Sequence, residues 1–224
     1  MQVSNETIEV LKNFAGINPN IVISPGQKLK TISEAKNIMA EADITEDFPL
    51  EFGIYDLHEF LSVLSLVDNP QLDFDENFVK VTNGGLNVKY FYSEKDILTT
   101  PQKDINMPEC EVGVNISVDQ IDTIKKAAAV LGHGELVIKG DNGKVTAEVY
   151  DTQDSTSNTF SLVLDEDNQC KDSFSFIFNM PILKLMGGDY YVNISSKLIS
   201  HWTNSDYPVN YSVSYTHLTL PTKA

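Results

Sequence analysis

Histidines, paired carboxylates and cysteines are the side chains of this sequence whose chemistry could serve catalysis or metal binding. His58, His133 and His201 have no spacing that would make a ligand pair, and none stands beside a candidate nucleophile, which favours surface or turn positions. Asp73 and Asp75 lie in turn-like sequence without a companion set of ligands, so a metal site there is the less favoured alternative. The sequence therefore predicts no catalytic residue, no bound metal and no cofactor.

The cysteines and the glycine-rich segments also favour structural over chemical roles. Cys110 and Cys170 are far apart and match no metal-ligand spacing, so we expect free thiols in a reducing cytosol, with a disulfide as the alternative. Residues 132–136 (GHGEL) leave an expected helix and enter an expected strand, the reverse of a phosphate-binding loop. Gly187 and Gly188 are typical of a helix end.

Lysines on expected helices are the residues that could bind nucleic acid. The chain has 16 Lys plus Arg against 32 Asp plus Glu, and its formal charge of -16 argues by itself against a general nucleic-acid or membrane binder. A lysine attracts phosphate as a point charge and reads no base sequence, so a lysine-bearing face would hold duplex DNA without specificity. The alternative is that each is a solvated helix lysine; the candidates are Lys12, Lys125, Lys126 and Lys184.

The segment 48–70 (FPLEFGIYDLHEFLSVLSLVDNP) predicts a strand, a capped helix and a turn. Residues 48–54 alternate apolar and polar side chains, as in a half-buried strand. Asp56 is placed as the N-cap, with Glu59 at the capping-box position, and the apolar stripe that follows ends at Pro70. The exposed face of this helix carries His58 and Glu59, which provide no fixed positive charge.

The same order of elements recurs in the second half of the chain. Ser4 caps a first helix and Ser117, with Gln120 at the box position, caps an equivalent one; residues 8–16 and 121–129 share their pattern. Residues 174–186 repeat the strand and short helix of 48–70. This internal repeat predicts an α+β protein of two similar domains, each a β-sheet with two helices on one face, and all four helices on a shared face.

Changes in composition along the chain indicate where the two domains begin and end. Residues 96–112 lack a clear period and suit an extended connector, which gives domains at 1–104 and 105–212. The string at 213–222 (VSYTHLTLPT) looks like a translated sequencing adaptor, so we expect 213–224 to be an artefact and exclude His217; a natural tail is the alternative. No signal peptide or membrane span is recognisable, which predicts a cytosolic protein.

Three segments resemble the DNA polymerase sliding clamp, or processivity factor, of large contractile-tailed bacteriophages. They are residues 11–18 (LKNFAGIN), 54–67 (IYDLHEFLSVLSLV) and 178–192 (FNMPILKLMGGDYYV), and the resemblance covers roughly residues 4–212. It implies the DNA clamp fold: a two-domain subunit that closes head to tail into a homotrimeric ring around duplex DNA, with helices lining the hole. A strand edge of domain 1 would pair with one of domain 2 in the next subunit.

The resemblance also implies partners and site residues. The replicative DNA polymerase, a clamp loader and late-transcription factors would be the partners, in the cytoplasm of the infected bacterial host. Partner peptides would dock in an apolar pocket, for which Ile105, Met107 and Pro108 of the connector are candidates. The helix 57–67 departs from the family pattern because it lacks lysine. The four lysines named above fall where the family presents basic residues to DNA.

A second hypothesis comes from another class of protein. The acidic composition would also suit a tandem-domain phage structural or interaction protein, such as a DNA mimic. The charge on the face shared by the expected helices distinguishes the two hypotheses: it carries lysines in a clamp and acidic residues in a DNA mimic.

Overall fold

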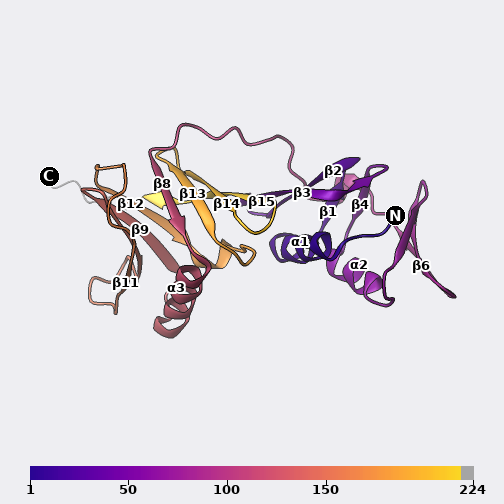
Figure 1. Ribbon diagram of the computed structural model, residues 1–224, viewed down its shortest axis with the longest axis horizontal. Coiled ribbons are helices and arrows are strands. Elements are labelled where there is room, and N and C mark those ends of the chain that lie inside the picture. Colours follow the sequence, from indigo (N-terminus) through magenta and orange to yellow (C-terminus); the bar gives the residue numbers. More distant parts are fainter. Residues whose placement is uncertain (218–224) are drawn as a thin grey trace. The chain divides into compact units, whose positions relative to one another are not determined.

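The computed structural model describes residues 1–217, and its contacts divide the chain into two compact units. Unit 1 comprises Met1–Asp104 with Lys184–Met186 and Pro208–Asn210. Unit 2 comprises Ile105–Leu183, Gly187–Tyr207 and the described residues from Tyr211 onward. Each unit contains its own strands and at least one α-helix (Figure 1).

Unit 1 places two α-helices beside antiparallel strands. Helix α1 packs against α2 and against the strands β2 and β3, while β1 pairs with β4 and the strands β5, β6 and β7 form a meander. The elements are α1 (Asn5–Ile17), β1 (Ile21–Ile23), β2 (Gly26–Ile32), β3 (Ile38–Phe48), β4 (Phe52–Ile54), α2 (Leu57–Leu64), β5 (Gln71–Phe74), β6 (Phe78–Asn83), β7 (Leu86–Phe91) and the 3-10 turn η1 (Lys95–Ile97).

Unit 2 places one α-helix, α3, against the strands β9, β10 and β11. Its strands run in the orders β11-β10-β9-β12-β16 and β8-β13-β14-β15. The elements are β8 (Val112–Ile116), α3 (Val118–Leu131), β9 (Glu135–Asp141), β10 (Lys144–Val149), β11 (Phe160–Asp165), β12 (Phe174–Asn179), the 3-10 turn η2 (Met180–Ile182), β13 (Tyr190–Ser195), β14 (Ile199–Asn204), β15 (Val209–Ser214) and β16 (Thr216–His217).

The two units repeat one order of elements. A helix, four strands, a short helical segment and a three-stranded meander follow one another as α1 to β7 in unit 1 and as α3 to β15 in unit 2. In both, the first strand after the helix pairs antiparallel with the strand before the short helical segment: β1 with β4, and β9 with β12. The predicted fold class, an α+β protein of two similar parts, is confirmed.

Local capping signals explain why α1 and α3 begin where they do. The Ser4 hydroxyl accepts from the Thr7 amide at 3.2 Å. In α3, Ser117 and Gln120 form the predicted reciprocal capping box, and Gly132 ends the helix with a positive φ of 72°. Both helix starts are predictable because each signal lies within a few residues of the helix.

The predicted fourth helix is wrong. Residues 180–182 form only the 3-10 turn η2, and Lys184 lies beyond it rather than on a helix. Its N-cap, Asn179, makes no side-chain capping hydrogen bond, and Pro181 disfavours α-helical backbone at the residue before it. Gly187 and Gly188 follow at once, so too few residues remain for stable α-helical turns.

Two further expectations need correction. The predicted strand 48–54 is broken, because Phe48 ends β3 and β4 begins at Phe52, with Pro49, which has no amide hydrogen, in the gap. The helical spacing of Val118, Ile121, Ile124, Ala128 and Leu131 predicts a buried stripe on α3, but of these only Ile124 and Ala128 are buried, and Val118 is 37% exposed.

The expected adaptor-derived segment, 213–224, is described only as far as His217. Val213 and Tyr215 are buried, and β16 pairs with the edge of β12. Such apolar and β-branched residues suit strands whatever their origin. Residues 218–222 of that string lie outside the described part of the chain.

Candidate nucleic-acid interface

Helix α1 presents one lysine and two acids to solvent. The Lys12 ammonium lies 2.7 Å from Glu9 Oε1, with the two side chains 56% and 51% exposed, and Glu6 is exposed one turn earlier. An exposed ion pair of this kind is weak, but it reduces the field that Lys12 offers to a phosphate. The exposed face of α1 is therefore not basic by itself.

Helix α3 presents two lysines without ion-pair partners. Lys125 and Lys126 are both exposed, and neither belongs to an ion pair within residues 1–217. Asp119 is exposed in the first turn, where the helix dipole favours acids, and Asp122 is exposed one turn before Lys126. The end of the exposed face nearer the C-terminus is thus the more basic one.

Helix α2 carries no lysine, as the sequence indicated. Asp56 accepts hydrogen bonds from the amides of His58 and Glu59 at 2.9 and 3.0 Å, which satisfies two of the free amides at the helix start. The predicted reverse bond of a capping box is not seen; Glu59 instead accepts from the Tyr90 hydroxyl at 3.4 Å. His58 and Glu59 are exposed.

Lys184, the remaining candidate, sits in the short segment Lys184–Met186 that groups with unit 1. Its side chain is exposed, and its carbonyl accepts from Asn13 Nδ2 of α1 at 2.8 Å. The backbone of Lys184 therefore lies beside Asn13 of α1, although Lys184 stands in a non-helical segment and not on the predicted helix.

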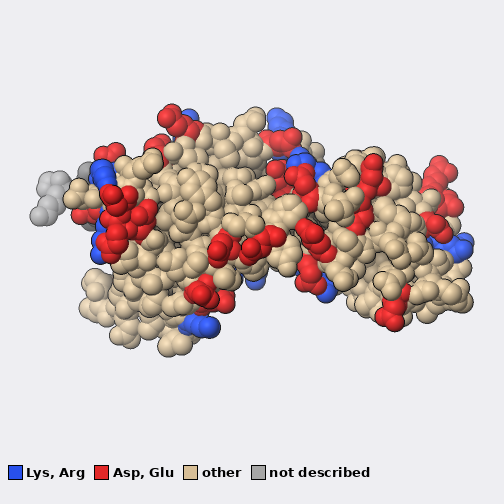
Figure 2. Space-filling view, viewed as in Figure 1, with Lys and Arg blue, Asp and Glu red and all other residues tan. Residues whose placement is uncertain are grey.

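All 16 basic residues of the chain are lysines. Lysine offers a compact charge on a flexible stem and no planar fork, so it suits phosphate better than base edges. In Figure 2 acidic side chains are more widespread on the visible surface than basic ones, which occur in small groups. Any DNA contact must therefore depend on local clusters rather than on net charge.

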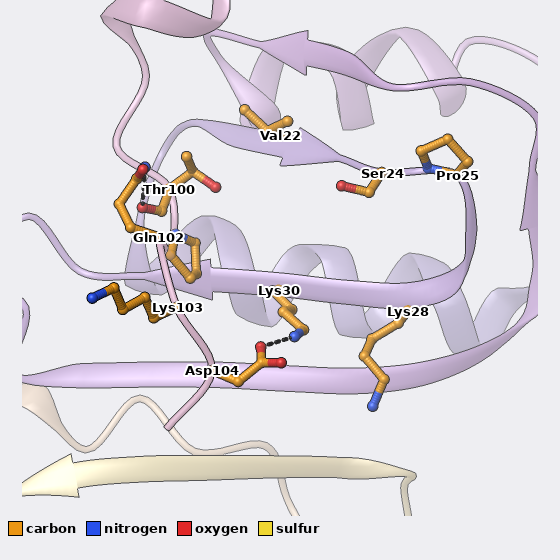
Figure 3. A pocket seen from close by; sticks show the side chains of 10 residues that line it. Val22, Ser24, Pro25, Lys28, Lys30, Thr100, Gln102, Lys103 and Asp104 are labelled. Carbon is orange, nitrogen blue, oxygen red and sulfur yellow. Dashed lines mark hydrogen bonds and ion pairs between the residues drawn. The ribbon is translucent and has the colours of Figure 1, made fainter. Parts of the chain in front are cut away.

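The structure adds a lysine cluster that the sequence reasoning missed. A cavity of about 380 Å³ in unit 1 is lined by Lys28 and Lys30 of β2 and by Lys103 of the connector (Figure 3). The alternation of a strand places Lys28 and Lys30 on one face, a signal that could have found them. Lys30 pairs with Asp104 and Lys28 with Asp43 at 3.0 Å.

These ion pairs largely neutralise the cluster. The hydrogen bond to Asp43 raises the pKa of Lys28 above its ordinary value, although burial acts against it. The hydrogen bond from Lys30 lowers the pKa of Asp104 in the same way. The cavity lysines thus stay charged but already have carboxylate partners, in contrast to Lys125 and Lys126.

The connector begins at a polar anchor within unit 1. Buried Asn18 donates from Nδ2 to the carbonyls of Ile32 at 2.8 Å and Thr99 at 3.2 Å, and the Thr99 amide donates to Asn20 Oδ1 at 2.9 Å. Beyond Asp104 the connector is extended: Ile105 is exposed, and Met107 and Pro108 are half-buried. None of these three side chains lines the lysine cavity, whose lining ends at Asp104.

The residues weighed for catalysis remain dispersed. His133 Nε2 lies 3.1 Å from the Asn158 carbonyl, and Gly132 closes α3 before β9, as expected for the segment 132–136. Cys110 and Cys170 are free thiols, as predicted, and burial raises the pKa of Cys110. Within residues 1–217 no group of acids, histidines and cysteines could hold a metal, and no helix there is long and apolar enough to cross a bilayer.

Known proteins resemble this chain over nearly its whole length. The sequence profile of the DNA polymerase processivity factor family matches residues 4–99. A sliding clamp of Vibrio phage KVP40 is 36% identical over 208 residues, which cover 90% of this chain and 94% of that protein. A sliding clamp of Escherichia phage RB69 is 29% identical over 197 residues, 86% of each chain.

A solved structure shares the fold at low identity. PCNA of A. fulgidus, solved with the C-terminal region of FEN-1 bound, superposes with a TM-score of 0.71 at 13% identity, covering 96% of this chain and 97% of that one. The relatives favour a clamp over an acidic DNA mimic.

Proposed function

This chain belongs to the sliding-clamp family of DNA polymerase processivity factors, and we propose that three copies of it close head to tail into a ring around duplex DNA. The observation that carries the proposal is the repeated order of elements, with a free sheet edge in each unit. Strand β7 ends the β5-β6-β7 meander, and β11 ends the order β11-β10-β9-β12-β16. Pairing of β7 with β11 of the next copy would satisfy both edges and close a ring.

Within this ring the helices α1 and α3 face the DNA. Lys125 and Lys126 supply the main phosphate contacts because they have no carboxylate partners, and Lys12 and Lys184 supply weaker ones. Such contacts are sequence-independent, which lets a clamp slide. Helix α2 instead packs beside α1 and holds the helical layer of unit 1 in place.

Partner proteins bind elsewhere on the subunit. The replicative polymerase, a clamp loader and late-transcription factors are the partners that we propose, with docking peptides held near Ile105, Met107 and Pro108. The anchoring of Thr99 by Asn18 and Asn20 supports this assignment, since it fixes where the connector leaves unit 1. The A. fulgidus relative, with a FEN-1 segment bound, is consistent with peptide docking in this fold.

The clamp acts in the cytoplasm of the infected bacterial host and has no catalytic activity of its own. Its domains are residues 1–104 and 105–212, and residues 213–224 are an adaptor-derived tail.

If the tail derives from an adaptor, replacing 213–224 by the C-terminal residues of a phage clamp should raise the midpoint of thermal unfolding. An equal midpoint would support a natural tail.

The assembly test uses light scattering on the chain with this replacement tail. We expect a trimer at micromolar concentration and stimulation of the cognate polymerase on primed circular DNA. The variant Lys125→Gln/Lys126→Gln should still be a trimer but should stimulate less at low salt, and this deficit should narrow as salt is raised, since each lost phosphate contact reduces the salt slope by about 0.9. A monomer that gives no stimulation would refute the ring, and unchanged stimulation by the variant would refute the lysine assignment.

A further inference from the structure

The exposed face of the β5-β6-β7 meander combines aromatic and basic side chains in two adjacent rows. Phe78 of β6 lies directly opposite Phe91 of β7, and Lys80 of β6 lies directly opposite Lys89 of β7. Side chains alternate along strands, so these four share one face, while Val79 and Val81 point to the other and are buried. We call Phe78, Lys80, Lys89 and Phe91 the sheet platform.

The two platform lysines have no carboxylate partners. Six lysines lie in strands within residues 1–217, and four of them, Lys28, Lys30, Lys139 and Lys144, form ion pairs. Lys80 and Lys89 form none in that part of the chain, although Asp73 of β5 lies opposite Lys80 in the register. Like charges directly opposite on adjacent strands repel, so a bound anion would reduce the repulsion between Lys80 and Lys89, with Asp73 flanking Lys80 on the β5 side.

The aromatic row is exposed rather than packed. The Phe91 side chain is 66% exposed, and its ring centroid lies 5.6 Å from that of half-buried Phe78. Lys89 Nζ lies 4.5 Å from the Phe78 centroid, so the cation sits against the aromatic row. An exposed phenyl ring with an adjacent cation is the arrangement on which an unpaired base stacks while its phosphate meets the ammonium group.

We propose that the sheet platform binds single-stranded DNA. Bases stack on Phe91 and the exposed part of Phe78, and the flanking phosphates contact Lys80 and Lys89. The lysine and phenylalanine rows are two residues apart, which is about 7 Å along the strand, so one extended strand can engage both rows. Paired bases in a duplex have no free faces, which is why the occupant is a single strand rather than the duplex of the proposed ring.

The platform uses a sheet face, whereas the proposed ring contact uses the backbone edge of β7. The two proposals therefore fail independently. Binding should tolerate any base, because every base has a stacking face. It should also depend on salt through two phosphate contacts, with a slope of about 1.4 when log affinity is plotted against log salt.

The test measures anisotropy of a fluorescent oligo-dT 15-mer that carries streptavidin at both ends, so that no ring can thread onto it. We expect binding by the full chain at 50 mM NaCl. Phe91→Thr should weaken it by roughly 5- to 150-fold. Lys80→Gln/Lys89→Gln should reduce the salt slope by about 1.4.

The matched control is Lys28→Gln/Lys30→Gln, which removes the same charge from β2 but takes lysines that already have carboxylate partners. It should bind the blocked 15-mer as the unsubstituted chain does. Absence of binding by the unsubstituted chain, or equal loss in both lysine pairs, would overturn the proposal. So would equal binding of a duplex blocked at both ends.

Light scattering separates the platform from a contact between copies. Phe91→Thr should leave the molar mass unchanged while it weakens oligo-dT binding. A lower mass with unchanged binding would assign Phe91 to a subunit interface and refute the single-strand site. Polymerase stimulation, measured on the same variants, reports on the clamp function separately.

Discussion

Within residues 1–217, unit 1 carries two α-helices and unit 2 carries one, although their strands follow the same order. In unit 1, Asp56 caps α2 with two hydrogen bonds and no proline follows within the helix. At the equivalent place in unit 2, Asn179 makes no capping bond and Pro181 follows two residues later. The comparison teaches that the strand order sets the position of a helix, while a few local residues decide whether it forms.

The two units also hold their first helices differently. Glu46 of β3, which is 8% exposed, accepts hydrogen bonds from the Ser4 amide and the Thr7 hydroxyl at the start of α1. The start of α3 has the neutral pair Ser117 and Gln120, and its Val118 amide donates to Asp189 Oδ1 at 2.7 Å. The pKa of Glu46 is lowered in the folded chain, so the stability of the α1 start should depend on pH, whereas the hydrogen bonds between Ser117 and Gln120 involve no titrating group.

Of the substitutions that distinguish the two units, removal of Glu46 should lower the free energy of unfolding most. Glu46→Ala leaves the Ser4 amide and the Thr7 hydroxyl without an acceptor, and should cost about 2 to 3 kcal/mol of unfolding free energy. Urea unfolding at pH 7, followed by circular dichroism, measures this. A loss below about 0.5 kcal/mol would show that water replaces the carboxylate without penalty.

The stabilisation by Glu46 should be lost at low pH. Burial alone would raise the pKa of Glu46, but the hydrogen bonds from Thr7 and Ser4 lower it below its ordinary value of 4.5. A lowered folded-state pKa gives stability that is present above pH 4.5 and is lost as pH falls through the folded value. The difference between the unsubstituted chain and Glu46→Gln should thus shrink below about pH 4.5, whereas the effect of Ser117→Ala should stay constant.

A smaller effect is expected at the helix caps that distinguish the units. Asp56→Ala should cost about 1 kcal/mol, because the amides of His58 and Glu59 lose their acceptor. Asn179→Ala is the matched control and should cost much less, since Asn179 caps nothing through its side chain. Equal losses in urea unfolding would contradict the explanation given for the missing helix.

The smallest effect concerns charge on the helical faces. Glu9→Gln removes the partner of Lys12 and makes α1 resemble α3, so duplex binding in low salt should tighten slightly. Stability should change by no more than about 0.5 kcal/mol. The variant Lys12→Gln/Glu9→Gln is the control and should lose this gain; if it binds as tightly as Glu9→Gln alone, Lys12 does not contact DNA.

Local signals made much of the fold predictable. Ser4, Ser117 and Gln120 act within three residues of their targets, so sequence spacing alone placed both helix starts. The missing fourth helix had a local signal too, because Pro181 and the pair Gly187 and Gly188 stand in the sequence. The prediction of a fourth helix instead followed the apparent repeat of the order of elements in unit 1.

Contacts between distant residues could not be read in the same way. Glu46 meets Thr7 across 39 residues, and Lys30 meets Asp104 across 74. Whether Lys28 or Lys30 is already paired with a carboxylate depends on such contacts, whereas the pair of Lys12 with Glu9 is local to α1 and could have been read from the spacing. The cavity around Lys28 and Lys30 was missed for the same reason, since its other wall comes from the connector.

The sequence by itself determined the repeated order of helices and strands, because hydrophobic periodicity and capping act over a few residues. It also determined that a phosphate contact by a side chain of fixed positive charge must be made by lysine, since the chain has no arginine. Only the tertiary structure decided which strand lysines are available, by pairing Lys28 and Lys30 with carboxylates and leaving Lys80 opposite Lys89. The physical reason is that charge is screened or reinforced by neighbours in space, which strand register and packing select.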